Sequence, residues 1–207
     1  MTLLLRVRQN SQKYTHIYMK RPFYTVLAAQ FFSSLADNAL ILASIALLRE
    51  ILNDPRPGDT EPLLKFFCTV AYVVLAPFVG AFADSRPKGK VMFITNLIKV
   101  VGCSIMLLGV SPLMAMVIVG LGAAAYSPAK YGIVTELVPA KDLVAANGWI
   151  ETLTVLSIIF GTVLGGFLSS PGVHTWLVGH YPTWSLSPGL TAVTMICVIY
   201  GIAALLN

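Results

Sequence analysis

Six apolar stretches, each about twenty residues long, follow one another along this chain of 207 residues. A helix of about twenty residues crosses the roughly 30 Å hydrocarbon core of a bilayer, because each residue adds about 1.5 Å along the axis. Only 11% of the residues are charged, whereas soluble domains average about 25%. The pattern predicts an all-α membrane protein whose six-transmembrane-helix bundle comprises residues 23–48, 63–83, 91–110, 113–134, 146–168 and 189–206.

The chain begins with a basic segment, residues 1–22, in which no side chain is acidic. The apolar run that follows is longer than the core of a signal peptide, which spans roughly 7 to 15 residues, and no small-residue cleavage site ends a shorter one. We therefore expect two parts: a cytoplasmic basic N-terminal segment, residues 1–22, and a bundle of six membrane helices, residues 23–207.

The loops between the predicted helices differ in basic content, and this difference predicts the orientation. If the chain starts in the cytoplasm, nine Lys and Arg residues lie on that side and three on the other. The nine are Arg6, Arg8, Lys13, Lys20, Arg21, Arg86, Lys88, Lys90 and Lys141, and the three are Arg49, Arg56 and Lys65. Basic loops stay in the cytoplasm, so we expect a multi-pass protein with both ends cytoplasmic. Since orientation accounts for the net charge of +5, we expect no nucleic-acid partner.

A lysine interrupts the fourth predicted helix, within the stretch from Gly120 to Glu136. An ammonium inside a membrane is energetically costly, so such residues usually face a protein interior or a water-filled cavity. Small residues before Lys130 let a neighbouring helix approach closely, and Pro128 removes a backbone hydrogen bond beside it. This stretch is typical of one wall of a transport path.

Charged and amide side chains also lie in other predicted helices. Asp37 and Asn38 occur about fourteen residues into the first helix, roughly 20 Å along its axis and near the middle of the bilayer. They either form a structural ion pair or hydrogen bond, or they couple to a substrate or an ion. Lys99 and Glu151 are about equally consistent with a paired structural charge and with a contact to a ligand. An unpaired charge at these positions would be costly, so each needs a partner of one kind or the other.

No arrangement of residues indicates an enzyme. The three histidines are predicted outside the helices, and none precedes an aspartate by five residues, as a glycerolipid acyltransferase requires. The sequence contains no glycine-rich phosphate loop. Cys68, Cys103 and Cys197 stand singly and lack the spacing of a metal site. The sequence therefore predicts no cofactor and no metal.

Several short motifs resemble those of a known transporter family. Residues 80–84 and 88–90 are similar to the loop signature of the major facilitator superfamily, although the second glycine lies five residues after the aspartate rather than three. Other motifs, from about Val26 onward, resemble the bacterial lysophospholipid transporter family of that superfamily. They are Ala29-Gln-Phe-Phe, Ala36-Asp-Asn-Ala-Leu40, Ala76-Pro-Phe-Val-Gly80, Gly122-Ala-Ala-Ala-Tyr-Ser-Pro-Ala-Lys-Tyr-Gly132, Ala146-Asn-Gly148 and Glu151.

The resemblance implies a transporter that moves lysophospholipids, such as lysophosphatidylethanolamine and lysophosphatidylglycerol, to the cytoplasmic leaflet of the bacterial inner membrane. It also implies a partner, an acyltransferase–acyl-carrier-protein synthetase, that reacylates them. The family's fold has twelve helices in two halves. We expect this chain to supply the N-terminal half, with the C-terminal six-helix half absent.

The same resemblance implies roles for particular residues. Lys130 would neutralise the lipid phosphate, and Asp37 with Asn38 would meet an ethanolamine or glycerol head group. Tyr126 shares the motif of Lys130 and is a further expected substrate-binding residue. The charges expected to have structural or coupling roles are Asp84, Lys99, Glu136 and Glu151.

Two alternatives remain open at the level of sequence. A major facilitator protein for another small molecule would share the fold, because fold alone does not determine the substrate. A half-bundle without transport activity, which serves as a membrane anchor or association partner, is consistent with the six predicted helices.

Overall fold

The computed structural model describes residues 21–53, 60–181 and 186–207, apart from some side chains of the second membrane helix. Residues 1–20, most of the predicted basic segment, lie outside the described residues. The α-helices are α2 (Arg21–Leu52), α3 (Thr60–Asp84), α4 (Lys88–Leu107), α5 (Pro112–Leu137), α6 (Leu143–Leu168), α7 (Pro171–His180) and α8 (Pro188–Leu205), and a short 3-10 helix, η2 (Ala140–Asp142), precedes α6.

Each predicted span coincides with a helix, which confirms the all-α membrane fold class. Five of the described helices, α2, α4, α5, α6 and α8, are long and apolar enough to cross a membrane. The predicted second span, α3, has 25 residues and continues through Pro77, but it is not among these five. The count of six spans is therefore approximate.

The sequence predicts no helix between the spans 146–168 and 189–206. This prediction was wrong, because helix α7 lies between them. The Ser170 hydroxyl accepts a hydrogen bond from the Val173 amide at 3.5 Å, and Pro171 occupies the first turn, where its missing N–H has no cost. His174 and His180 consequently lie in a helix rather than outside the helices. The apolar spans were identified by their length, and α7 is too short for that criterion.

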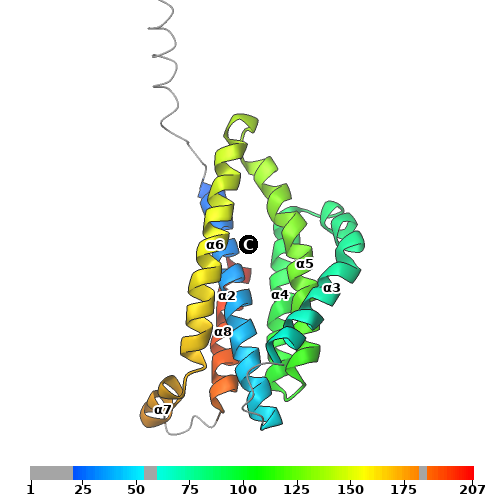
Figure 1. The fold of residues 1–207 in the computed structure, drawn as a ribbon. Helices are drawn as coiled ribbons and strands as arrows, with labels where there is room; N and C mark the ends of the chain where they lie inside the picture. The colour runs from blue at the N-terminus through cyan, green and yellow to red at the C-terminus, as the bar shows by residue number, and fades with distance from the viewer. Residues whose placement is uncertain (1–20, 54–59, 182–185) are drawn as a thin grey trace, which may run out of the picture.

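The membrane helices form two groups, α2 with α6 and α8, and α3 with α4 and α5 (Figure 1). Packing of α4 against α8 joins the groups, whereas α5 and α6 make few contacts with each other. The main apolar core lies where α2, α4 and α8 meet, and includes Leu40, Met106 and Ile196. The two groups therefore close on one side and stay apart on the other.

Glycines allow α6 to lie directly against the backbone of α2. A Cβ atom on Gly161 would lie 2.5 Å from the Leu35 carbonyl oxygen, and one on Gly165 would lie 2.5 Å from that of Ala39. Such distances are shorter than any van der Waals contact, so only glycine fits at this helix crossing. This glycine pair thus sets the close packing of α6 on α2.

A carboxylate ties the end of α2 to the beginning of α8. Glu50 accepts hydrogen bonds from the Gly189 amide at 2.8 Å and from the Ser187 hydroxyl at 2.6 Å. Amides at a helix N-terminus lack partners in their own helix, and a carboxylate there also complements the helix dipole. The two helices thus run antiparallel, and the beginning of α2 and the end of α8 lie toward the same end of the bundle (Figure 1).

Candidate functional site

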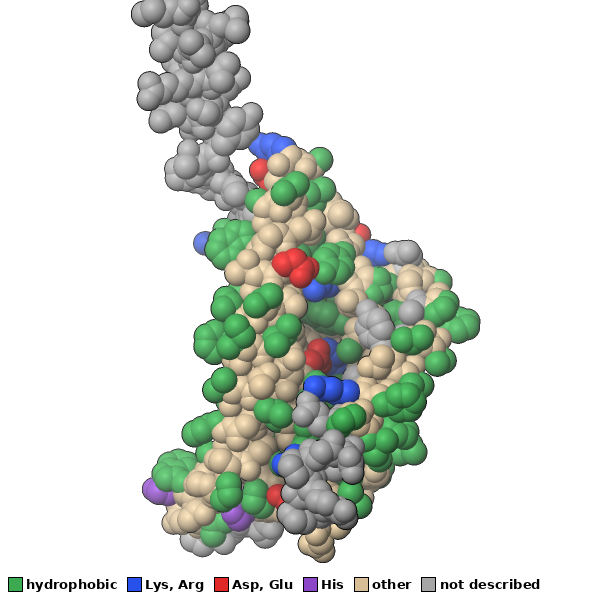
Figure 2. Space-filling view, viewed as in Figure 1, with side chains coloured by type: hydrophobic (Ala, Val, Ile, Leu, Met, Phe, Trp, Pro, Cys, Tyr) green, Lys and Arg blue, Asp and Glu red, His purple; other side chains and the backbone are tan. Residues whose placement is uncertain are grey.

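A polar cavity of about 230 Å³ lies between the two groups of helices. Basic and acidic side chains gather in a hollow between the groups on the face shown in Figure 2, and apolar side chains cover much of the flanks. The cavity is lined by Gln30, Ser33, Ser34, Asp37, Lys99, Ala123, Tyr126, Ser127, Lys130 and Thr154. Three larger hollows, of about 560, 370 and 280 Å³, have mostly apolar walls and lie against α7, between α2 and α6, and on α6. We therefore take the smaller, polar cavity as the candidate site.

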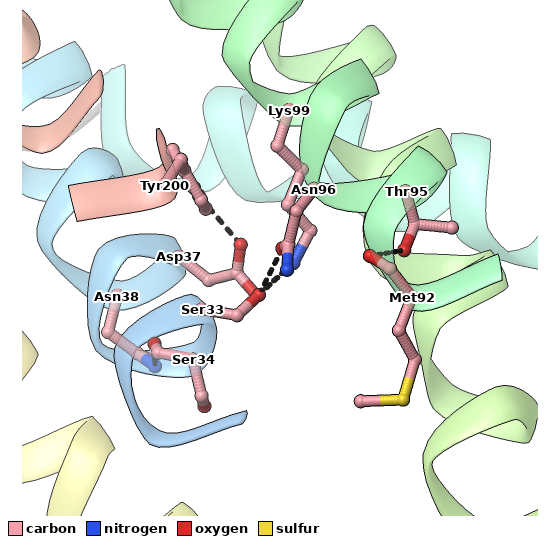
Figure 3. A network of polar contacts seen from close by, with 9 residues as sticks. All are labelled: Ser33, Ser34, Asp37, Asn38, Met92, Thr95, Asn96, Lys99 and Tyr200. Atoms are coloured by element: carbon pink, nitrogen blue, oxygen red, sulfur yellow. Dashed lines mark hydrogen bonds and ion pairs between the residues drawn. The ribbon is translucent and has the colours of Figure 1, made fainter. Parts of the chain in front are cut away.

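An ion pair between α2 and α4 forms one wall of the cavity (Figure 3). The Lys99 ammonium donates to the Asp37 carboxylate at 2.8 Å, and the Tyr200 hydroxyl of α8 donates to the other Asp37 oxygen at 2.6 Å. Lys99 is fully buried, whereas 30% of the Asp37 side chain is exposed. A buried ammonium requires such a partner because it has lost its hydration. Asp37 thus holds the three helices α2, α4 and α8 together.

Neutral hydrogen bonds extend this network along α2 and α4. The Ser33 hydroxyl accepts from Lys99 at 3.0 Å and donates to the Asn96 side-chain carbonyl at 2.7 Å. This chain of bonds assigns the amide orientation, since Lys99 cannot accept the serine proton and Asn96 must therefore present its oxygen. The Asn96 side-chain nitrogen is buried and has no partner in the described part of the chain.

Two tyrosine rings complete the surroundings of Lys99. Its nitrogen lies 5.0 Å from the ring centre of Tyr126 and 5.5 Å from that of Tyr200. Both distances are within the range of a cation–π attraction, which is stronger when the cation has lost water. The Lys99 charge is therefore compensated by a carboxylate, a hydroxyl and two rings.

Lys130 lies on α5, on the opposite wall of the cavity, in a different environment. The residue is 8% exposed, and its nitrogen lies 4.6 Å from the centre of the Tyr131 ring. Among the residues that the structure describes, Lys130 has no ion pair or hydrogen bond. Pro128, two residues earlier, has no amide hydrogen, so the Ala124 carbonyl lacks its usual helical donor. This wall therefore presents a cation that has no counter-ion within hydrogen-bond distance among the described residues and is attracted by Glu151 only at longer range.

Gln30 connects the cavity to α6. Its side-chain nitrogen donates to the Thr154 hydroxyl at 2.7 Å and contacts the Ile150 carbonyl at 3.4 Å. The Thr154 hydroxyl donates its proton to that same carbonyl at 2.8 Å. A lone pair of the hydroxyl oxygen is therefore free to accept from the glutamine nitrogen. The polar side chains of α2 and α6 thus hold each other in fixed positions beside the cavity.

The structure brings together some of the predicted site residues and separates others. Asp37, Tyr126 and Lys130 line the same cavity. Asn38 does not line it, because its side-chain nitrogen donates to the Ser34 carbonyl at 2.8 Å. The predicted charged residue Lys99 is part of the network around Asp37.

Two of the acidic residues predicted to have structural or coupling roles, Glu151 and Glu136, lie outside the cavity. Glu151 is exposed and accepts a hydrogen bond from the Tyr131 hydroxyl at 2.6 Å. Glu136 is exposed near the end of α5. Asp84 ends α3, and its side chain is outside the described part of the chain. Neither Glu151 nor Glu136 belongs to the cavity wall.

Sequence reasoning missed several polar residues beside the cavity, among them Tyr200, Ser33 and Gln30. Ser33 and Gln30 precede Asp37 by four and seven residues, the spacing that places them on its helix face, so this periodicity could have found them. Tyr200 lies 163 residues from Asp37 along the chain, and no spacing rule connects them. Only the packing of α8 against α2 reveals that contact.

Comparison with known proteins places these observations in a family. A model described as the Major Facilitator Superfamily matches residues 26–206. A protein named lysophospholipid transporter LplT from Yersinia enterocolitica serotype O:8 / biotype 1B is 45% identical over 151 residues, which cover 73% of this chain and 37% of that protein. One of the same name from Yersinia pestis (strain Pestoides F) is 39% identical over 189 residues, 91% of this chain and 42% of that protein.

The chain therefore spans about two fifths of the length of these relatives. The family match, in contrast, extends over nearly all of the described helices. Its helical architecture, with five described helices able to cross a membrane, agrees with that match. This chain belongs to the major facilitator superfamily, in which it is similar to the lysophospholipid transporters.

Proposed function

We propose that this chain forms the head-group-binding part of a transporter that moves lysophospholipids across the bacterial inner membrane to the cytoplasmic leaflet. The proposed substrates are lysophosphatidylethanolamine and lysophosphatidylglycerol. The proposed partner is a cytoplasmic-side acyltransferase–acyl-carrier-protein synthetase that reacylates them. The observation that carries the proposal is a polar cavity within an apolar bundle, where Lys130 has no ion pair to any described residue.

The balance of charge around the cavity supports an anionic ligand. Asp37 and Lys99 compensate each other at 2.8 Å, so their pair contributes little net charge. Lys130 adds one positive charge on the facing wall. The phosphodiester of a lysophospholipid carries one negative charge, and a charge-assisted hydrogen bond to an ammonium would compensate it in a medium of low dielectric constant.

Asp37 retains the capacity to contact the rest of the head group. Each of its oxygens accepts one hydrogen bond, from Lys99 or from Tyr200, and a carboxylate oxygen has two lone pairs. With 30% of the side chain exposed, an ethanolamine ammonium or a glycerol hydroxyl could donate to it without displacing Lys99. In this proposal Asn38 fixes the helix turn behind Asp37, and Tyr126 forms the wall beside the head group.

The single acyl tail of the substrate would remain against lipid or an apolar wall while the head group crosses. Alternating access in this superfamily requires two bundles that rock about a shared site. We therefore propose that a second six-helix half, which this chain does not contain, supplies the facing wall, and that both ends of this chain are cytoplasmic.

Uptake of labelled lysophosphatidylethanolamine tests the proposal. The gene product that carries this chain would be expressed in cells without their own lysophospholipid transporter. We expect Lys130→Ala to abolish uptake, while Lys141→Ala, which removes an exposed lysine of η2, retains it. Lys130→Arg keeps the charge and changes the shape of the side chain. Retained uptake would show that the charge suffices, and lost uptake would show that a close fit is required. Unchanged uptake by Lys130→Ala at normal expression would exclude this assignment.

Two measurements separate the alternatives. If soluble metabolites compete with uptake and lysophospholipids do not, the protein transports another small molecule. For the 207-residue chain alone in liposomes, we expect binding of lysophospholipid without efficient transport. Absence of binding would favour a half-bundle that serves as an anchor or association partner.

A further inference from the structure

Two serine hydroxyls in the cavity wall lack the hydrogen bonds that hydroxyls in these helices usually form. Ser104, Thr162 and Ser169 each donate to the carbonyl four residues earlier, at 2.8–2.9 Å. Ser34 on α2 and Ser127 on α5 also lie in helices, are half-buried, and line the cavity. Neither hydroxyl has a hydrogen-bond partner among the described residues. Both are thus available to a ligand.

The positions of these serines relate them to Lys130. Ser127 precedes Lys130 by three residues, so both lie on the same face of α5. Ser34 lies on α2, which forms another part of the cavity wall. The backbone carbonyl of Ser34 already accepts the Asn38 side-chain nitrogen, which leaves the hydroxyl as its remaining polar group. Besides the paired Lys99, the cavity is thus bordered by the Lys130 ammonium and by two hydroxyls, one from α2 and one from α5, that have no partner among the described residues.

We infer that Ser34, Ser127 and Lys130 together form a phosphate subsite, in which both serine hydroxyls donate to the non-bridging oxygens of the head-group phosphate. This inference rests on the proposed function, because it assigns the phosphate to this cavity. One cation compensates one phosphodiester charge, and further neutral donors solvate its oxygens without adding charge.

The test compares lipids with and without phosphate. Uptake is measured against concentration for lysophosphatidylglycerol in the gene product that carries this chain, with Ser34→Ala, Ser127→Ala and the matched control Ser104→Ala. Each cavity variant should raise the half-saturating concentration about tenfold, the effect of one hydrogen bond to a charged group. Ser34→Thr and Ser127→Thr keep the hydroxyl and should restore most of the affinity.

A binding measurement makes the result independent of transport. Thermal stabilisation of the purified protein is titrated with lysophosphatidylglycerol and with a monoacylglycerol, which has the same tail and no phosphate. The alanine variants should weaken the response to the phospholipid and leave the response to the monoacylglycerol unchanged. Equal loss for both lipids would show a packing effect and overturn the inference.

The outcomes distinguish the inference from the proposed function. If Lys130→Ala abolishes uptake while both serine variants behave like Ser104→Ala, the phosphate subsite is wrong and the transporter assignment stands. If the wild-type protein takes up no lysophospholipid, the proposed function fails, and the phosphate-dependent binding of the serine variants still decides whether the subsite exists.

Discussion

Lys99 and Lys130 lie on neighbouring helices and border the same cavity, yet their surroundings differ in almost every respect. Lys99 is fully buried and has a carboxylate at 2.8 Å, a hydroxyl at 3.0 Å and two tyrosine rings. Lys130 has one ring at 4.6 Å and no ion pair among the described residues. The comparison distinguishes a charge that holds helices together from a charge that is available to a ligand.

The difference follows from how the helices pack. Around Lys99, α4 packs against α8, and the Asp37 and Ser33 side chains reach it from α2, so its partners come from two helices. Around Lys130, α5 has few contacts with α6, and the polar cavity occupies the space between them. We call these regions the closed side, around Lys99, and the open side, around Lys130. Stability should depend on the closed side and ligand binding on the open side.

The largest loss of stability should come from removing Lys99. Lys99→Met leaves the Asp37 carboxylate without its cation, and breaking a buried ion pair costs about 3–5 kcal/mol. Unfolding in mixed detergent micelles, followed by circular dichroism, measures the free energy. The double variant Asp37→Asn/Lys99→Met should recover much of the loss, because no unpaired charge remains. A single variant as stable as the wild type would contradict the assignment of a closed side.

A smaller loss should follow from separating α6 from α2. Gly165→Ala places a methyl group 2.5 Å from the Ala39 carbonyl oxygen, and such overpacking costs about 1–3 kcal/mol. Gly166→Ala is the matched control, because the nearest atom, a methyl carbon of Leu42, is 3.8 Å away. The same unfolding measurement compares them. Equal stabilities would mean that this helix crossing adjusts easily and is not part of the rigid frame.

The third prediction tests whether the closed side extends to the end of α8. Glu50→Gln keeps a hydrogen-bond acceptor for Gly189 or Ser187 but removes the charge at the helix N-terminus. The expected cost is about 1 kcal/mol, since the site is near the surface. Glu136→Gln, on the exposed end of α5, serves as the control. High salt should reduce the effect of Glu50→Gln if the lost interaction is electrostatic.

The smallest effect on stability should come from Lys130, despite its predicted importance for transport. Lys130→Ala breaks no ion pair between described residues, so the change in the free energy of unfolding should be smaller than for the three variants above. Lysophospholipid should stabilise the wild-type protein and not this variant. A destabilisation as large as that of Lys99→Met would show that Lys130 also stabilises the fold, and it would remove the contrast between the two lysines.

The fold was largely predictable from the sequence because membrane spans are apolar, long and separated by polar loops. The predicted and observed bounds of the span around Lys130, residues 113–134 and α5 (Pro112–Leu137), differ by one residue at the start and three at the end. Helix α7 escaped prediction because it depends on local capping by Ser170 rather than on apolar length. The presence of charged residues in the spans was also evident from composition alone.

Which charges are paired was not predictable. Asp37 and Lys99 were each recognised as costly, but their separation of 62 residues gave no sign that they are partners. Likewise, Asn38 adjoins Asp37 and nevertheless bonds to its own helix, since successive residues point in different directions around a helix. Tertiary packing decides these contacts, and spacing rules apply only within one helix.

The contacts of α2 also have a consequence for the order in which the protein is made. The Asp37 carboxylate enters the membrane with the first helix, whereas Lys99 is synthesised 62 residues later and Tyr200 163 residues later. Similarly, the Gly189 amide that bonds to Glu50 is synthesised 139 residues after it. The nascent first helix is therefore incomplete as a membrane segment, and its acidic side chains find all their partners only when the last helix of this chain has been inserted.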